Sequence, residues 1–202
     1  ATASNALEVN TNANATVLNA NAPEVNTDVS HTLFNPKSKT LEGHSGIVYS
    51  VAILGPDKIV SGSADSTIKI WNMNGECVKT LDSHSGAVHC VGTCGDGNLI
   101  VSGSRDMTVK IWSRGGECLK TMRGHSDCVS CIASFGDVIV SGSDDTTVKI
   151  WNMNGECVRT LRGHGWSVYS VAILGPDRIV SGSADNTVKI WNTDGECLKT
   201  LE

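Results

Sequence analysis

The stretch "IVSGSADSTIKIWNMNGECVKTL" occupies residues 59–81 and returns as "IVSGSADNTVKIWNTDGECLKTL" at residues 179–201. Two further versions lie between them, so the phrase occurs four times at intervals of 39 to 41 residues. A constant period of this length indicates a structural unit that stacks on copies of itself. The chain is therefore expected to build one architecture from four similar pieces.

Each unit is predicted to form four short strands separated by turns. In the first unit, Ile68 and Ile70 alternate with Lys69, as expected for a strand with one buried face. No stretch shows the 3.6-residue period of an amphipathic helix, so an all-β fold is predicted. The strands expected in the first unit are 47–54, 58–63, 67–71 and 76–81, with turns at "GPD" and "NMNG".

The repeated letters also carry a resemblance. Each unit contains Gly-His or Ser-His, then Ser-Gly-Ser, then Asp-x-Thr-x-Lys-Ile-Trp, and on this pattern residues 39–202 resemble the WD-repeat family of β-propellers. The sequence departs from the family pattern in small ways, since Asn or Ser follows the Trp in place of Asp. The resemblance implies a propeller of four-stranded antiparallel blades, four in this chain, at about 45–81, 85–122, 126–161 and 165–201.

Every unit carries a His, a Ser, an Asp and a Trp. Taken singly, His44, Ser61 and Asp65 have the residue types of a base, a nucleophile and an orienting acid. The set nevertheless occurs four times, whereas an active site is normally built once from unlike residues. Because the indole N–H of the accompanying Trp can only donate a hydrogen bond, the set is predicted to be a buried structural network rather than a catalytic site. Its members are His44, Ser61, Asp65, Trp71, His84, Ser102, Asp106, Trp112, His125, Ser141, Asp145, Trp151, His164, Ser181, Asp185 and Trp191.

If the core is repetitive, binding specificity must come from positions that differ between units. The family resemblance implies that partners contact one face of the propeller, at positions three and five residues after the repeat His and just before the repeat Asp. Aromatic and Arg side chains dominate binding hot spots, which favours the non-identical residues at and beside these positions. The predicted partner-binding residues are Tyr49, His89, Arg105, Asp144, Trp166 and Tyr169.

Eight cysteines raise the question of disulfides or zinc. Four of them recur in the phrase "GEC" and hold equivalent places in successive units, so they cannot all pair with each other. The single Cys-x-x-Cys at 128–131 lacks the second ligand pair that a structural zinc site needs. The cysteines are therefore expected to be small buried thiols, and no metal or cofactor is predicted.

Composition limits the class of partner. The chain is 40% hydrophobic and 18% charged, with a net charge of −5 and evenly spread Lys and Arg, which argues against nucleic-acid binding. No run of 18 apolar residues is present, so membrane insertion is not expected. The first 30 residues lack the pattern of a secretory signal, which favours the cytoplasm and leaves an extracellular assembly open.

Residues 1–38 differ from the rest of the chain. They are rich in Asn, Ala and Thr, contain one aromatic residue, and cannot bury enough apolar surface to fold alone. Short strand-like pieces within them could pair with an exposed sheet edge. An extended, edge-pairing N-terminal arm is therefore predicted.

The number of blades poses a problem, because the resembled family most often closes its ring with seven. "KTLEGH" at 39–44 also matches the fourth strand of a unit although no complete unit precedes it, which leaves one strand too many for the usual closure. Three explanations stay open at this point: a fragment of a longer propeller, two copies closing into an eight-bladed ring, or strands supplied by residues 1–38.

Two functions follow from these alternatives. The first is a non-enzymatic scaffold that binds protein partners through the propeller face. The second is a structural subunit that assembles with copies of itself into a ring or filament, with the N-terminal arm completing a neighbouring propeller. The resemblance implies an architecture and does not choose between them.

Overall fold

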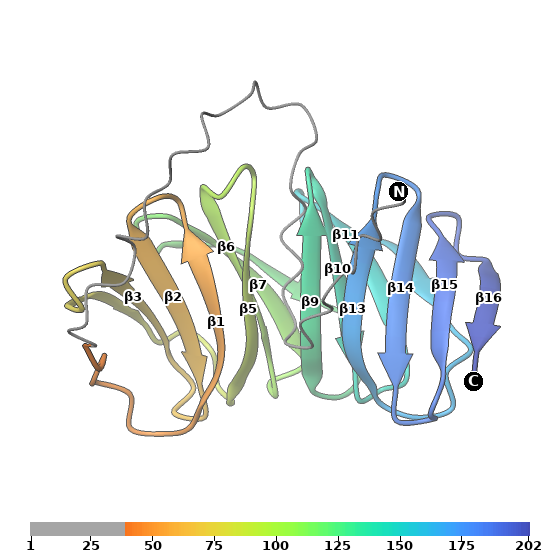
Figure 1. Ribbon diagram of the computed structural model, residues 1–202, viewed down its shortest axis with the longest axis horizontal. Coiled ribbons are helices and arrows are strands. Elements are labelled where there is room, and N and C mark those ends of the chain that lie inside the picture. Colours follow the sequence, from red (N-terminus) through yellow and green to blue (C-terminus); the bar gives the residue numbers. More distant parts are fainter. Residues whose placement is uncertain (1–38) are drawn as a thin grey trace, which may run out of the picture.

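A computed structural model describes residues 39–202 of the chain, so the predicted N-terminal arm lies outside the described residues. The described part consists of sixteen strands in four sheets, and it contains no helix that could span a membrane. Each sheet has four strands paired in chain order, and every pairing is antiparallel. The predicted all-β architecture of four four-stranded blades is therefore confirmed (Figure 1).

The four blades follow one another along the chain. Blade 1 contains β1 (Val48–Leu54), β2 (Lys58–Ser63), β3 (Ile68–Asn72) and β4 (Cys77–Leu81). Blade 2 contains β5 (Val88–Cys94), β6 (Leu99–Ser104), β7 (Thr108–Ser113) and β8 (Cys118–Arg123). Blade 3 contains β9 (Val129–Phe135), β10 (Val138–Ser143), β11 (Val148–Asn152) and β12 (Cys157–Leu161). Blade 4 contains β13 (Val168–Leu174), β14 (Arg178–Ser183), β15 (Val188–Asn192) and β16 (Cys197–Leu201).

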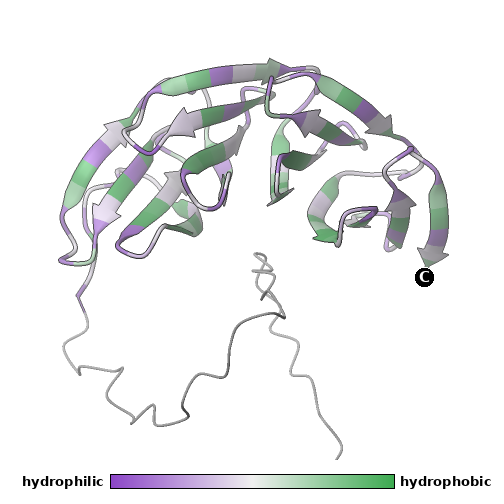
Figure 2. Ribbon diagram, turned by 90° about the horizontal axis from the view of Figure 1, so that it is seen from above, coloured by the Kyte–Doolittle hydropathy of each residue, from purple (hydrophilic) through white to green (hydrophobic). Residues whose placement is uncertain are grey.

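The blades lie side by side in an open arc (Figure 2). The first strands of the blades, β1, β5, β9 and β13, contact one another along the concave side (Figure 1). The fourth strands lie on the convex side, where β16 carries the C-terminus. An arc of this kind has two end faces, one on blade 1 and one on blade 4, that no other blade covers within residues 39–202.

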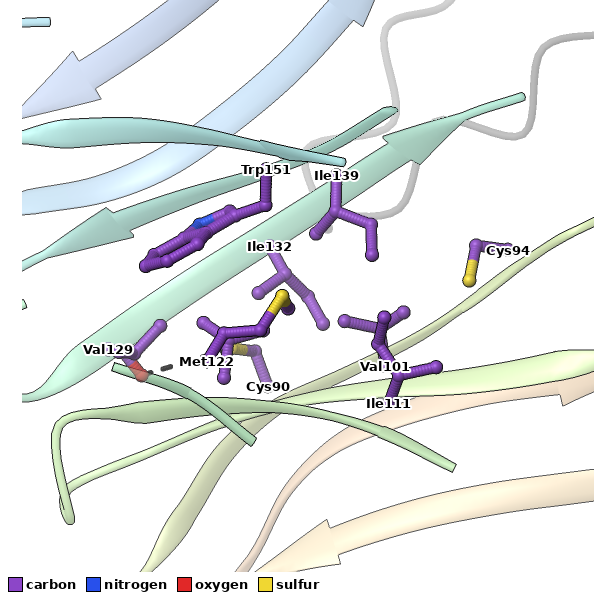
Figure 3. Packing of buried hydrophobic residues seen from close by; sticks show 10 residues of the cluster. Cys90, Cys94, Val101, Ile111, Met122, Val129, Ile132, Ile139 and Trp151 are labelled. Carbon is purple, nitrogen blue, oxygen red and sulfur yellow. Dashed lines mark hydrogen bonds between the residues drawn. The ribbon is translucent and has the colours of Figure 1, made fainter. Parts of the chain in front are cut away.

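The hydrophobic core lies between blades rather than within them. In the cluster between blades 2 and 3, Val101, Ile111 and Met122 of blade 2 meet Ile132 and Trp151 of blade 3 (Figure 3). Similar clusters join blade 1 to blade 2 and blade 3 to blade 4. Each sheet therefore buries its apolar side chains against the next sheet, as expected for stacked repeats.

The same position is buried or exposed depending on whether a neighbouring blade is present. Val88 in β5 is 0% exposed because it packs on blade 1, while the equivalent Val48 in β1 is 46% exposed. At the other end of the arc, Leu201 is 41% exposed, whereas the equivalent Leu81 of blade 1 is 3% exposed. Both end faces are thus apolar surfaces of the type that is buried inside the arc.

Residues 39–43 precede β1 and form no strand. Leu41 nevertheless packs on the β3–β4 turn, since a Cβ built at Gly75 would lie 2.9 Å from Leu41 Cδ2. Leu81 of β4 lies against Gly116 of blade 2 in the same way. The extra strand-like segment noted in the sequence thus occupies the place of a preceding blade's fourth strand, but it has no third strand to pair with in the described residues.

Candidate functional site

The repeated polar residues form one hydrogen-bonded chain in each blade, and blade 2 shows its geometry. Trp112 Nε1 donates to Ser102 Oγ at 2.8 Å, and Ser102 Oγ lies 2.7 Å from His84 Nε2. His84 Nδ1 lies 2.8 Å from Asp106 Oδ2. Because the indole only donates and the carboxylate only accepts, the serine hydroxyl donates to Nε2 and His84 donates from Nδ1.

The other three blades repeat this chain of contacts, with all distances between 2.7 and 2.8 Å. The structure thus brings together every predicted network residue within its own blade. The sets are His44, Ser61, Asp65 and Trp71 in blade 1, His125, Ser141, Asp145 and Trp151 in blade 3, and His164, Ser181, Asp185 and Trp191 in blade 4.

The aspartate of each network also fixes the turn between the second and third strands. Asp106 Oδ1 accepts hydrogen bonds from the backbone N–H and the hydroxyl of Thr108, and Oδ2 accepts the N–H of Ser85. These contacts hold Met107 at φ 65°, in the left-handed region that non-glycine residues rarely adopt. One carboxylate therefore ties together the turn, the histidine and the loop that leads into the blade.

Hydrogen bonding determines the charge state of this pair. Burial alone raises the pKa of Asp106, but the hydrogen bonds from Thr108 and His84 outweigh it and lower the pKa to about 2. Burial lowers the pKa of His84, and the nearby Asp106 carboxylate only partly offsets this effect. At neutral pH the pair is therefore an ionised aspartate that accepts a hydrogen bond from a neutral histidine.

This arrangement has the residue order of a hydrolytic triad but not its accessibility. Ser102 and Ser141 are 0% exposed, and each hydroxyl already accepts the N–H of a buried Trp. A nucleophile needs an open approach for its substrate, which a serine beneath an indole lacks. Four fully partnered networks instead favour a single rigid packing of each blade.

Other residues complete the network and were not singled out from the sequence. Thr108 Oγ1 donates to Asp106, and the second serine of Ser-Gly-Ser, Ser104, donates to Gly86 O while accepting the N–H of Asp106. Both residue types occur at the same place in all four units. That fourfold recurrence in a turn was the available signal.

The predicted partner-binding residues lie at one end of the blades. Backbone hydrogen bonds join the start of each first strand to the residue before the repeat Asp, for example from Arg105 N to Ala87 O at 2.9 Å and from Asp144 N to Cys128 O at 2.9 Å. The corresponding positions of the four blades therefore form one continuous face, here called the loop face.

Part of the loop face is a cluster contributed by three blades. Tyr49 of blade 1 and His89 of blade 2 stack with ring centroids 4.7 Å apart and an interplanar angle of 8°. Burial lowers the pKa of His89. Asp144 of blade 3 partly offsets this shift and Arg105 of blade 2 adds to it, so both charged groups lie near the imidazole. Asp144 also accepts a hydrogen bond from Ser130 Oγ at 3.0 Å.

The remaining two predicted residues lie on blade 4. Trp166 is 68% exposed and Tyr169 is 61% exposed. Within residues 39–202 neither makes a ring contact or a side-chain hydrogen bond with the Tyr49–His89 cluster. The structure therefore brings together Tyr49, His89, Arg105 and Asp144, and leaves two exposed aromatic side chains on the neighbouring part of the same face.

The expectation that the cysteines are buried is wrong for half of them. The "GEC" cysteines stand at the start of the convex-side strands and are exposed, because no further strand covers that side. The remaining cysteines are buried, and Cys131 Sγ donates to Val168 O of the next blade at 3.6 Å. Among residues 39–202 no three potential ligands gather as a metal site. The exposed thiols are Cys77, Cys118, Cys157 and Cys197, and the buried ones are Cys90, Cys94, Cys128 and Cys131.

Comparison with known proteins gives one family. The WD40 model, described as WD domain, G-beta repeat, matches four segments that together make up well over half of the chain. The later three segments begin just before a fourth strand and end with the third strand of the next blade, so a family repeat is offset from a structural blade. The matched segments are 35–72, 75–113, 116–152 and 155–192.

Similar curated proteins share only short stretches with this chain. F-box/WD repeat-containing protein 7 of Drosophila melanogaster is 43% identical over 53 residues, which are 26% of this chain and 4% of that protein. WD repeat-containing protein pop1 of Schizosaccharomyces pombe is 33% identical over 54 residues, 26% of this chain and 7% of that protein. The Ribosome biogenesis protein BOP1 homolog of Drosophila grimshawi is 37% identical over 65 residues, 31% of this chain and 8% of that protein.

Proposed function

This chain belongs to the WD40 family, and from that premise we propose that it is a non-enzymatic scaffold that binds protein partners through its loop face. WD40 repeats generally mediate contacts between proteins. The observation that carries the proposal is the cluster of Tyr49, His89, Arg105 and Asp144, which three blades contribute to one exposed face. Two of its members, Tyr49 and Arg105, are of residue types that are enriched in binding hot spots.

The contrast between the networks and the loop face supports this proposal. The network residues are the same in all four blades, whereas the position five residues after the repeat His holds Tyr49, His89, Ser130 or Tyr169. A position that varies while its supports stay constant is suited to distinguishing one partner from another. The face therefore offers charged groups on blades 2 and 3 beside aromatic groups on blades 1 and 4.

A protein partner fits this face better than a nucleic acid. Arg105 and Asp144 shift the pKa of His89 in opposite directions, so the centre of the face is not a concentrated positive field. The chain as a whole has a net charge of −5. A peptide that places an acidic group near Arg105 and apolar side chains near Trp166 and Tyr169 would complement the face.

Panning a library of random displayed peptides against the full chain tests this proposal even though the natural partner is unidentified. Enriched peptides should bind at least about tenfold more weakly to Arg105→Ala and to Tyr169→Ala, the size of effect expected for hot-spot residues. Val78→Ala on the convex side is the matched control and should leave binding unchanged. Peptides that bind all variants equally would show that the loop face is not the binding surface.

The second proposed function is self-assembly into a ring or filament, with residues 1–38 completing a neighbouring propeller. It is supported by blade 4, whose Val188 and Leu201 are exposed and have no following blade within residues 39–202. Light scattering on the full chain and on a chain lacking residues 1–38 tests it. The expected result is a larger assembly for the full chain than for the shortened chain, and equal masses would rule out a role for residues 1–38.

A further inference from the structure

The three joints between blades share one steric feature, a valine seated over a glycine. Val88 of blade 2 lies over Gly62 of blade 1, where a Cβ on the glycine would lie 2.7 Å from Val88 Cγ1. A Cβ placed on Gly103 would likewise lie 2.6 Å from Val129 Cγ1, and one placed on Gly142 would lie 2.7 Å from Val168 Cγ1. A side chain at any of these glycines would displace the valine, so each glycine forms a socket for the next blade.

Within residues 39–202, one such glycine and one such valine lack a partner of this kind. Gly182 is the equivalent glycine in blade 4, and a Cβ there would meet nothing closer than Ser170 Cβ at 3.9 Å. Val48 is the equivalent valine in blade 1, and it lies half-exposed on the opposite end face. Nothing within residues 39–202 requires position 182 to be glycine, since its backbone has no positive φ.

The surfaces around this socket and this valine match the surfaces of the internal joints. The strands β1 and β13 both read "VYSVAIL", and β13 already packs on blade 3 through Val168 and Val171. Around Gly182, blade 4 presents the same kinds of apolar side chain that blade 1 buries against blade 2. These are Val180, Val188, Ile190 and Leu201 in blade 4, and Val60, Ile68, Ile70 and Leu81 in blade 1.

A hydrogen bond that crosses the internal joints is also missing at the end face of blade 4. Ser50 Oγ accepts the N–H of Val91 at 3.1 Å across the joint between blades 1 and 2, and Cys90 Sγ donates to Val129 O at 3.8 Å across the next joint. The equivalent Ser170 of blade 4 is exposed and makes no side-chain hydrogen bond within residues 39–202. A first strand of this kind on a following blade would supply its partner.

We infer that the end face of blade 4 is a docking surface for blade 1 of a second copy of this chain, with Val48 of that copy seated over Gly182. A second copy fits because its blade 1 carries the strand, the valine and the apolar surroundings that already form the internal joint of blade 4 with blade 3. The contact is head-to-tail, so it closes into a ring or continues as a filament. It does not involve the loop face, and its failure would leave the scaffold proposal intact.

For blade 1 of the second copy to dock, a leucine from the other copy must replace a leucine of its own. In the docking copy, Leu41 occupies the place over Gly75 that Leu201 of the other copy, the one offering blade 4, would take, by analogy with Leu81 over Gly116. The competing segments carry the same letters, "KTLE" at 39–42 and "KTLE" at 199–202. The segment 39–42 is therefore a built-in competitor that keeps the docking reversible.

The test is the solution mass of the full chain by light scattering over a concentration series. The wild-type mass should rise to twice that of one chain or more. Val48→Asp should abolish the rise, because docking would bury an unpaired carboxylate, and Gly182→Val should abolish it by filling the socket. Val78→Asp is the matched control, since Val78 is as exposed as Val48 but lies on β4 away from both end faces.

A mixture of the two defective variants separates docking from any loss of folding. The Val48→Asp chain keeps its socket and the Gly182→Val chain keeps its valine, so equal amounts should form a two-chain complex, although each variant alone is monomeric. Circular dichroism melts should match wild type, since neither position is packed against another blade within one chain. A wild-type chain that stays monomeric at all concentrations, a mixture that does not associate, or a control as defective as Val48→Asp would overturn the inference.

Discussion

Trp71 and Trp151 have the same sequence neighbours and the same hydrogen bond to a serine, but they stabilise different contacts. Trp151 packs against blade 2 in the cluster that joins the two blades, whereas Trp71 belongs to no such cluster and is covered by the segment around Gly43. Both indoles are nearly fully buried. The comparison teaches that a repeated phrase determines the fold of its own blade, while the neighbouring blade determines how much the same residue contributes to stability.

Removing these two indoles tests this comparison with the largest expected effect. Trp151→Ala should lower the free energy of unfolding by about 3–5 kcal/mol, through the lost packing between blades and the lost hydrogen bond from the indole to Ser141 Oγ. Trp71→Ala should cost at least about 1 kcal/mol less, because only the segment before β1 covers it. Urea denaturation followed by circular dichroism measures both, and equal costs would show that neighbouring blades contribute little.

The network aspartates give the next effect. Asp106→Asn should lower the free energy of unfolding by about 1.5–3 kcal/mol at neutral pH, because an ionised acceptor shared by His84 and Thr108 is lost. The equivalent Asp185→Asn in blade 4 should cost less, because that blade has only one neighbour. Thermal melting of both variants in the same buffer measures the difference, and a larger loss for Asp185→Asn would contradict it.

The pH dependence of stability checks the charge state assigned to the same pair. The pKa of Asp106 falls from the ordinary 3.8 to about 2 on folding, so the folded state binds the proton less readily than the unfolded state. Its contribution is therefore complete above pH 3.8 and is lost as the pH falls towards 2. Asp106→Asn should flatten this part of the Tm curve, and an unchanged slope would show that other carboxylates dominate acid unfolding.

The glycine sockets compare a joint inside the arc with the uncovered end face of blade 4. Gly103→Val should destabilise the fold by about 1–3 kcal/mol, because its Cβ would overlap Cys90 and Val129 at the joint between blades 2 and 3. Gly182→Val, the same change in blade 4, should leave the free energy of unfolding of the monomer within about 0.5 kcal/mol of wild type. Urea denaturation at low protein concentration makes the comparison, and equal losses would contradict it.

The smallest expected effect concerns the turn residue after the repeat Asp. Thr146 has φ 71° and Asn186 has φ 64°, although only Asn tolerates the left-handed region well. Thr146→Asn should therefore gain about 1 kcal/mol, and Asn186→Thr should lose a similar amount. Differential scanning calorimetry of the two exchanges tests this, and changes of the same sign would rule out backbone strain as the cause.

Much of the fold could be predicted from the repeat alone. The strand expected at 47–54 runs from Val48 to Leu54, and the one expected at 58–63 has those bounds, because alternation and turn residues are local properties of the chain. The pattern could not reveal that the "GEC" cysteines are exposed. Their exposure depends on a strand lying at the outside of its sheet, which is a property of the assembled blade.

The candidate sites likewise contain some features that the sequence reveals and others that it does not. The residues of each network were found from their fourfold recurrence, because a period of about 40 residues places equivalent residues at equivalent points. The stacking of Tyr49 on His89 depends on a contact between two blades. A single sequence contains no signal for a contact whose two members sit in different units and are not repeated as a pair.

The place over Gly75, Gly116 and Gly155, which Leu41, Leu81 and Met122 fill in turn, has a genetic consequence. Because successive blades meet through equivalent residues, a coding segment that runs from one Lys/Arg-Thr-Leu/Met to the next can be duplicated or deleted while the contacts between blades on either side are kept. Misaligned recombination between such near-identical segments would change the array by whole blades, in steps of 39 to 41 residues.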